Sequence, residues 1–142
     1  MRALLDVNVL VALLDAGHAE HAAASQWLAA ESAHGWASCP ITVNGCVRVM
    51  SHPGYPLGFP ASAVIERLAA ASAGPGHAFW PDDVSLLDPA VADASRIHGP
   101  RAVSGLYLLA LALRHGGRFV TFERALVPGA IRGATSAHLV VL

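Results

Sequence analysis

The 142-residue sequence contains no lysine, and all nine of its basic residues are arginine. Charged residues make up only 13% of the chain, and the formal net charge is −1 at pH 7, so no overall basic character indicates nucleic-acid binding. Apolar residues make up 54%, which exceeds what the core of an ordinary soluble monomer requires. We therefore expect a second copy of the chain, in a homodimer, or another partner to cover part of this apolar surface.

Cysteine is scarce as well. Cys39 and Cys46 lack Cys-x-x-Cys spacing, which excludes the common zinc and redox motifs. The longest nearly apolar run, Val103 to Leu113, is too short to cross a bilayer, so no membrane segment is predicted. The chain begins with a strand pattern and an acid at position 6, which predicts no signal peptide. We expect one cytoplasmic domain spanning residues 1–142.

Short apolar runs alternate with helical patterns along the chain. Strands are predicted at residues 3–5, 36–39, 77–80, 118–122 and 138–142. Helices are predicted at residues 9–14, 18–33, 40–50, 61–73, 88–98 and 103–115, with a brief helical turn at 123–126. This alternation is typical of an α/β fold in which helices cover both faces of a parallel sheet.

Asp6 ends the apolar run Ala3-Leu4-Leu5, which is typical of a buried, central parallel strand. In open α/β sheets, functional sites lie beyond the carboxyl ends of the strands, so Asp6 is a candidate for chemistry. Asp6 would equally serve as the N-cap of the following helix, accepting its first N–H groups. The two roles are compatible.

Glu123 follows a second buried strand pattern, Phe119 to Phe122. Two parallel strands that each end in a carboxylate at the same sheet edge would place both groups on one divalent ion. Oxygen ligands of this kind suit Mg²⁺ or Mn²⁺. Such an ion would activate water and screen the charge of a phosphodiester. The alternative is that Glu123 is a first-turn acid stabilised by the dipole of a short helix.

Six segments together carry a resemblance that spans the chain end to end. They are Leu5 to Leu10, Trp36 to Thr42, Asn44 to Met50, Val103 to Ala112, Phe119 to Glu123, and His138 to Leu142. With these segments, the chain resembles PIN-domain toxins of the VapC family, which belong to VapBC toxin–antitoxin systems. The resemblance implies a three-layer α/β/α sandwich of the RNase-H-like type. It also implies Mg²⁺- or Mn²⁺-dependent RNA cleavage, dimerisation, and inhibition by a VapB-type antitoxin.

The same resemblance implies roles for individual residues. Asp6 and Glu123 would be the metal ligands and catalytic carboxylates, with Glu123 replacing the family's shorter aspartate. Asn44 and Ser104 would be neutral polar positions beside the ion, and Asn8 would brace the loop after the first strand.

Two acids of the family pattern are absent. The positions following Thr42 hold Val43 and Asn44, and the aspartate that opens the family's long apolar helix is replaced by Gly105. Because fewer charges weaken cation binding, a second hypothesis is a degenerate PIN domain. Such a protein would bind a VapB-type antitoxin with weak or no cleavage of RNA.

Among the remaining polar residues, Arg48 and Arg124 are predicted to contact RNA phosphates or an antitoxin carboxylate. Arg101 is expected to be an ordinary surface residue. The pair His18 and His21 has metal-ligand spacing but no third partner, and is expected to be a solvated polar face.

Overall fold

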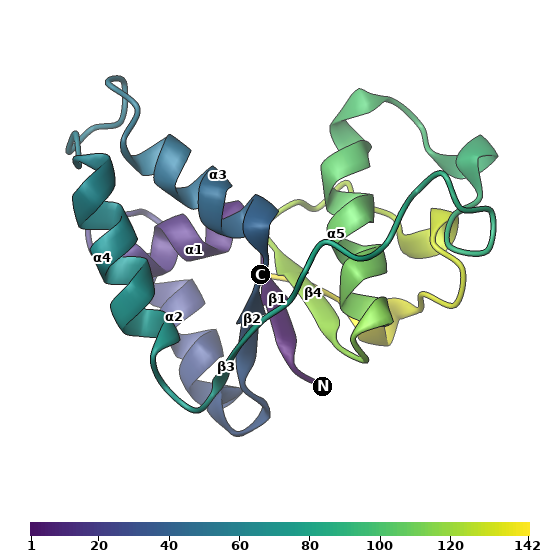
Figure 1. The fold of residues 1–142 in the computed structure, drawn as a ribbon, viewed down its shortest axis with the longest axis horizontal. Helices are drawn as coiled ribbons and strands as arrows, with labels where there is room; N and C mark the ends of the chain where they lie inside the picture. The colour runs from purple at the N-terminus through teal and green to yellow at the C-terminus, as the bar shows by residue number, and fades with distance from the viewer.

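The computed structural model describes all residues 1–142 and contains a five-stranded, entirely parallel sheet (Figure 1). The strands are β1 (Ala3–Leu5), β2 (Trp36–Ser38), β3 (His77–Phe79), β4 (Arg118–Thr121) and β5 (Leu139–Val141). Their order across the sheet is β3-β2-β1-β4-β5. β1 is therefore the central strand, as its continuous apolar run predicts, and β4 lies directly beside it.

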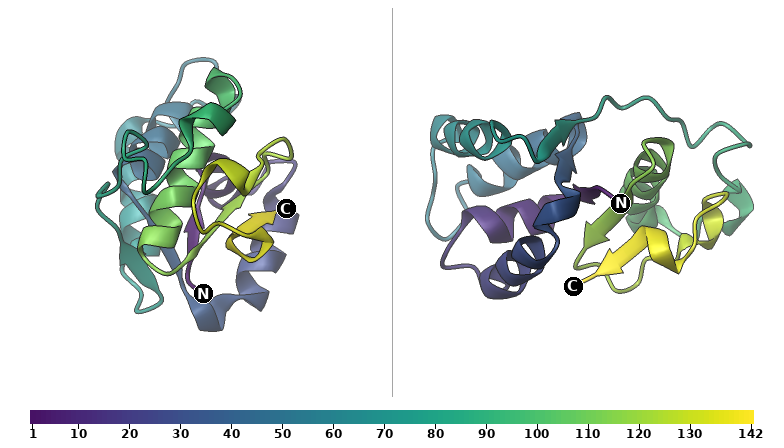
Figure 2. Two further views of the ribbon diagram at one scale, coloured as in Figure 1. Left: turned by 90° about the vertical axis from the view of Figure 1, so that its right-hand side faces the viewer. Right: turned by 90° about the horizontal axis from the view of Figure 1, so that it is seen from below.

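Helices cover both faces of this sheet. The α-helices are α1 (Val7–Leu14), α2 (His21–Ala30), α3 (Pro40–Met50), α4 (Ala61–Ser72) and α5 (Val103–Arg114). Short 3₁₀ helices are η1 (Ser32–His34), η2 (Ala94–Arg96), η3 (Pro100–Ala102), η4 (Pro128–Ala130) and η5 (Ser136–His138). Figures 1 and 2 show α1 to α4 on one side of the sheet and α5 with the C-terminal turns on the other.

Two apolar cores result, because successive strand residues point to opposite faces. Leu4 and Phe119 pack on the α5 side, whereas Leu5 and Val120 pack on the side of α1, α3 and α4. The predicted three-layer α/β/α sandwich is thus confirmed. None of the helices combines the length and the apolar character that crossing a bilayer requires.

The helix predicted at residues 88–98 is wrong. Asp88 accepts a hydrogen bond from the backbone N–H of Ala90 and forms a turn instead of a helix start. Ala92 then forms an antiparallel bridge with Ile131, which draws this segment onto a part of the chain about 40 residues away. The helical turn predicted at 123–126 is also wrong, since these residues form a non-helical turn.

Gly45 allows α3 to pack closely on α1, the helix that follows Asp6. A Cβ atom added at Gly45 would lie 2.5 Å from Cγ2 of Val7. Any larger residue at position 45 would therefore force the Val7 side chain or one of the two helices to move. This close approach matters for the site because Val7 is the first residue of α1.

Gly45→Ala is expected to destabilise the protein by about 1–2 kcal/mol, because the overlap with Val7 outweighs the better helix propensity of alanine. In a Val7→Ala background the same substitution should become neutral or stabilising. Urea denaturation measures both. Gly74→Ala is the control, since a Cβ at Gly74 meets nothing within 4 Å. Stabilisation by Gly45→Ala alone would contradict the packing described.

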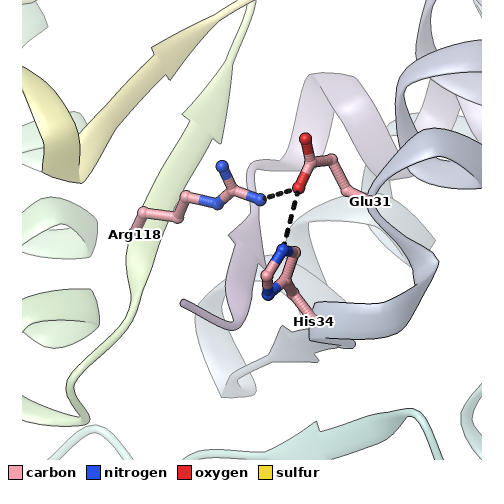
Figure 3. Close-up of polar contacts among 3 residues, drawn as sticks. All are labelled: Glu31, His34 and Arg118. Atoms are coloured by element: carbon pink, nitrogen blue, oxygen red, sulfur yellow. Dashed lines mark hydrogen bonds and ion pairs between the residues drawn. The ribbon is translucent and has the colours of Figure 1, made fainter.

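An ion pair links α2 and η1 to the start of β4. It lies at the amino ends of the strands, whereas Glu123 follows the carboxyl end of β4. Arg118 donates a 2.5 Å hydrogen bond to Glu31, and His34 lies 3.7 Å from the same carboxylate (Figure 3). The hydrogen bond from Arg118 holds the pKa of Glu31 below its usual value. The Arg118 guanidinium also lies 5.2 Å from the ring centre of Trp27, so this contact fixes α2 against the sheet.

Candidate functional site

Asp6 lies at the carboxyl end of β1 and is the N-cap of α1. Its Oδ1 accepts a 2.7 Å hydrogen bond from the backbone N–H of Val7. Its Oδ2 accepts a 2.6 Å hydrogen bond from the hydroxyl of Thr121 at the end of β4. The capping role considered for Asp6 is therefore present, and it leaves the carboxylate at the sheet edge where sites of α/β proteins lie.

Thr121 joins the ends of the two central strands. Its side chain is fully buried, and its Oγ1 accepts hydrogen bonds from the backbone N–H of Glu123 at 3.0 Å and from Nδ2 of Asn8 at 3.4 Å. One hydroxyl thus contacts Asp6, Asn8 and the backbone of Glu123. The sequence shows only a threonine near the end of an apolar run, which is no signal for this role.

Burial raises the pKa of Asp6 above its usual value, and the charge of nearby Glu123 raises it further. The hydrogen bonds from Thr121 and from the N–H of Val7 act in the opposite direction without cancelling the rise. The charge of Glu123 is therefore close enough to oppose ionisation of Asp6. A cation bound between them would relieve this repulsion.

The raised pKa predicts a pH-dependent cost in stability. Ionised Asp6 lowers the free energy of unfolding, and this cost disappears as the pH falls from above the folded pKa to below the unfolded one. Asp6→Asn should therefore raise Tm at pH 7 in EDTA, with a gain that shrinks in acid. Asp93→Asn should do the reverse, because Ser95 holds the pKa of Asp93 low. Thermal melts between pH 3 and 8 test both signs.

Glu123 lies on the surface two residues beyond β4. One of its carboxylate oxygens, Oε1, accepts a 2.9 Å hydrogen bond from the backbone N–H of Ala125, and no protein donor binds the other. Glu123 also lines a hollow of about 200 Å³. The other lining residues are His98, Arg101, Ala102, Ala125 and Leu126.

Three of the positions considered in the sequence differ in exposure: Ser104 and Arg124 are exposed, whereas Gly105 is covered by another side chain. Ser104 is exposed in the first turn of α5. A Cβ added at Gly105, the next residue, would lie 3.1–3.2 Å from the two Cδ atoms of Leu126. Leu126 thus covers the position where the family pattern has a carboxylate. Arg124 is exposed beside Glu123 and forms no ion pair.

Two other predicted residues lie on α3. Asn44 is exposed and has no side-chain hydrogen bond. Arg48 lines a separate hollow of about 470 Å³ with His52, Tyr55 and Pro56, and not the hollow beside Glu123. The arginine that lines the hollow beside Glu123 is Arg101, which was expected to be an ordinary surface residue.

The histidine pair has a structural explanation. The Nδ1 atom of His21 is 2.7 Å from the carbonyl oxygen of Ala12, so this ring is tied to α1. His18 accepts a hydrogen bond from the backbone N–H of Glu20. The expected solvated face is therefore wrong for His21, because folding brings the half-buried ring onto the preceding helix.

The family model of the PIN domain matches residues 3–127. Ribonuclease VapC44 of Mycobacterium tuberculosis is 51% identical to this chain over 142 residues, which is the full length of both proteins. This chain belongs to the VapC family of PIN-domain ribonuclease toxins. Ribonuclease VapC39 of the same organism is 45% identical over 134 residues, covering 94% of this chain and 96% of that protein.

A solved VapC structure shares the fold. The crystal structure of Mycobacterium tuberculosis VapC20, described as a sarcin–ricin loop cleaving toxin, has a TM-score of 0.59 to this chain. The match covers 89% of this chain and 97% of VapC20 at 14% identity. At that identity the likeness concerns the arrangement of the sheet and helices alone.

VapC ribonucleases generally use divalent metal ions, which bind to carboxylate oxygens. No three His, Cys, Asp or Glu side chains are grouped so as to hold an ion. Asp6 and Glu123 nevertheless end neighbouring strands and interact electrostatically. This pair fits the type of Mg²⁺ site in which one or two carboxylates act together with waters and substrate phosphates.

Proposed function

We propose that this VapC chain is a Mg²⁺- or Mn²⁺-dependent endoribonuclease, with Asp6 and Glu123 as its catalytic carboxylates and metal ligands. The observation that carries the proposal is the junction at Thr121. Its hydroxyl donates to Asp6 and accepts from the N–H of Glu123, which holds the ends of β1 and β4 together. Both carboxylates are therefore presented at the same edge of the sheet.

When bound, the divalent ion would activate water and stabilise the charge of the phosphodiester. The protein would supply position and charge. Two hydrogen bonds orient the Asp6 carboxylate before any ligand arrives. Glu123 keeps one oxygen without a protein donor and so available to an ion. Ser104 and Asn44 would add neutral oxygens near the ion, and Asn8 would steady Thr121.

The proposal includes partners and location. A VapB-type antitoxin would neutralise the chain, and the chain would form a homodimer in the cytoplasm, where its RNA substrates are. Exposed apolar side chains support a covering partner: Phe79 is 58% exposed and Val127 71% exposed. Residues 1–142 would form one domain, since β1 and β5 belong to the same sheet. Arg48 and Arg124 would contact RNA phosphates or the antitoxin.

A second candidate function is binding of the antitoxin without cleavage of RNA. Gly105 and Val43 favour it, because neither position supplies a carboxylate, and Leu126 covers Gly105. With only two carboxylates, the affinity for a divalent ion would be lower than in a site with four.

RNA cleavage by the purified chain separates the two candidates. The nuclease should cut several RNAs in Mn²⁺ and none of them in EDTA. Calorimetry should detect Mn²⁺ binding to the wild type and a clear loss of it in Glu123→Gln. A chain that binds antitoxin, takes up no Mn²⁺ and cuts none of the RNAs would support the binding protein and contradict the nuclease.

A further inference from the structure

The hollow beside Glu123 contains two basic side chains that have no established role. His98 and Arg101 come from the segment before α5, and Arg101 belongs to η3. Ala102, Ala125 and Leu126 form the apolar part of its wall, and Glu123 is its acidic lining residue. We call this hollow the Arg101 pocket. It brings Glu123 together with basic groups that lie more than 20 residues earlier in the sequence.

The basic groups of the Arg101 pocket are not occupied by the protein itself. Arg101 and His98 are both exposed, and neither forms a side-chain hydrogen bond or an ion pair. Arg118 and Arg132 are partnered, by Glu31 and by the carbonyl of Pro89, whereas Arg101 shares its lack of a partner with Arg124, which is exposed beside Glu123. A guanidinium that lines a concave surface without a partner is suited to an anion.

The volume of the Arg101 pocket and the charges on its wall limit which anions it can bind. About 200 Å³ is less than drug-sized ligand pockets usually offer, but it admits a phosphate group with part of its sugar. The first turn of α5, which follows Ala102, contains no acidic residue. Glu123 is therefore the one carboxylate on the pocket wall, and it would repel an anion as long as its own charge is not compensated.

We propose that the Arg101 pocket binds a backbone phosphate of RNA next to the bond that Asp6 and Glu123 would cleave. This inference rests on the proposed nuclease function and names a subsite of it. Arg101 donates to the phosphate oxygens, His98 lies on the same wall, and the apolar residues contact the sugar. Arg101 and His98 are positioning residues, because they hold the strand and do not act on the reacting atoms.

The test is equilibrium binding of a fluorescein-labelled RNA 12-mer in EDTA, followed by fluorescence anisotropy over a range of KCl concentrations. Arg101→Ala should weaken binding about three- to tenfold and lower the slope of log Kd against log salt by about 0.7, the contribution of one phosphate contact in a single strand. His98→Ala should weaken binding less. Glu123→Gln should tighten it, because the repelling charge is gone.

Arg114→Ala is the matched control. Arg114 lies at the other end of α5, is 61% exposed and makes only a 3.9 Å contact with Asp83. Arg114→Ala removes one positive charge, as Arg101→Ala does, but from a position outside the Arg101 pocket. Equal losses of affinity and equal salt slopes for Arg101→Ala and Arg114→Ala would overturn the proposal, and would leave Arg101 to another anion such as a carboxylate of a protein partner.

Cleavage in Mn²⁺, measured on the same proteins, distinguishes this inference from the function it rests on. A wild type that binds RNA through Arg101 but cuts none would contradict the proposed nuclease and support the pocket. A wild type that cuts RNA, with Arg101→Ala binding RNA no more weakly than Arg114→Ala does, would support the nuclease and overturn the pocket. Circular dichroism spectra of all variants establish that they are folded.

Discussion

Replacing Asp6 with alanine is expected to reduce RNA cleavage by about 100-fold or more. Asp6 is the more buried of the two carboxylates, and two hydrogen bonds hold it in place at the end of the central strand. Loss of groups that only orient a metal ligand typically costs 10- to 100-fold, so loss of the ligand itself should cost at least as much. Thr121→Val, which removes the orienting hydroxyl, should fall within that smaller range.

The alanine variant also loses the N-cap of α1, which is worth about 1 kcal/mol, so the lost charge must be separated from the lost cap. Asp6→Ser provides the separation, because serine caps helices but carries no carboxylate. Asp6→Ser should be as inactive as Asp6→Ala while keeping more of the stability. Asp93→Ala controls for the removal of an acid elsewhere, since the Asp93 side chain forms hydrogen bonds only with Ser95. Full cleavage by Asp6→Ser would refute the assignment.

Gly105→Asp is expected to tighten Mn²⁺ binding by about tenfold and to increase cleavage, because it adds a third negative ligand to a depleted site. The new carboxylate would lie in the first turn of α5, where the helix dipole favours an acid. Its Cβ would meet the flexible end of Leu126 at 3.1–3.2 Å, so that side chain must move by a few tenths of an ångström. Calorimetry with Mn²⁺ and RNA cleavage measure the two effects.

Gly105→Asn is the control for this gain, since asparagine displaces Leu126 in the same way but brings no charge. The gain should appear in Gly105→Asp alone. If both variants bind Mn²⁺ equally, position 105 does not lie beside the ion, and the missing charge there is irrelevant to activity. If the natural chain is inactive and Gly105→Asp cleaves RNA, the loss of this acid is what inactivates the chain.

Local sequence patterns were sufficient to predict the strands and helices whose apolar residues recur with a regular spacing. The apolar run at 3–5 and the mostly apolar segment at 118–122 predicted the two central strands, because strands buried on both faces are rich in apolar residues. The helix predicted at 88–98 failed, since a start signal at Asp88-Pro89 does not exclude pairing with a distant segment. The bridge between Ala92 and Ile131 is such a pairing.

The contacts between residues of the candidate site could not be predicted from local sequence, because they form only when distant elements pack together. Thr121 and Asp6 are 115 positions apart, and nothing near either residue indicates their hydrogen bond. The same holds for Leu126 over Gly105 and for Arg101 beside Glu123. Local periodicity was enough to predict the strands, the parallel α/β architecture and the two acids at the strand ends. The surroundings of those acids could not be predicted in this way, because side chains from distant elements meet there only when the sheet and helices pack.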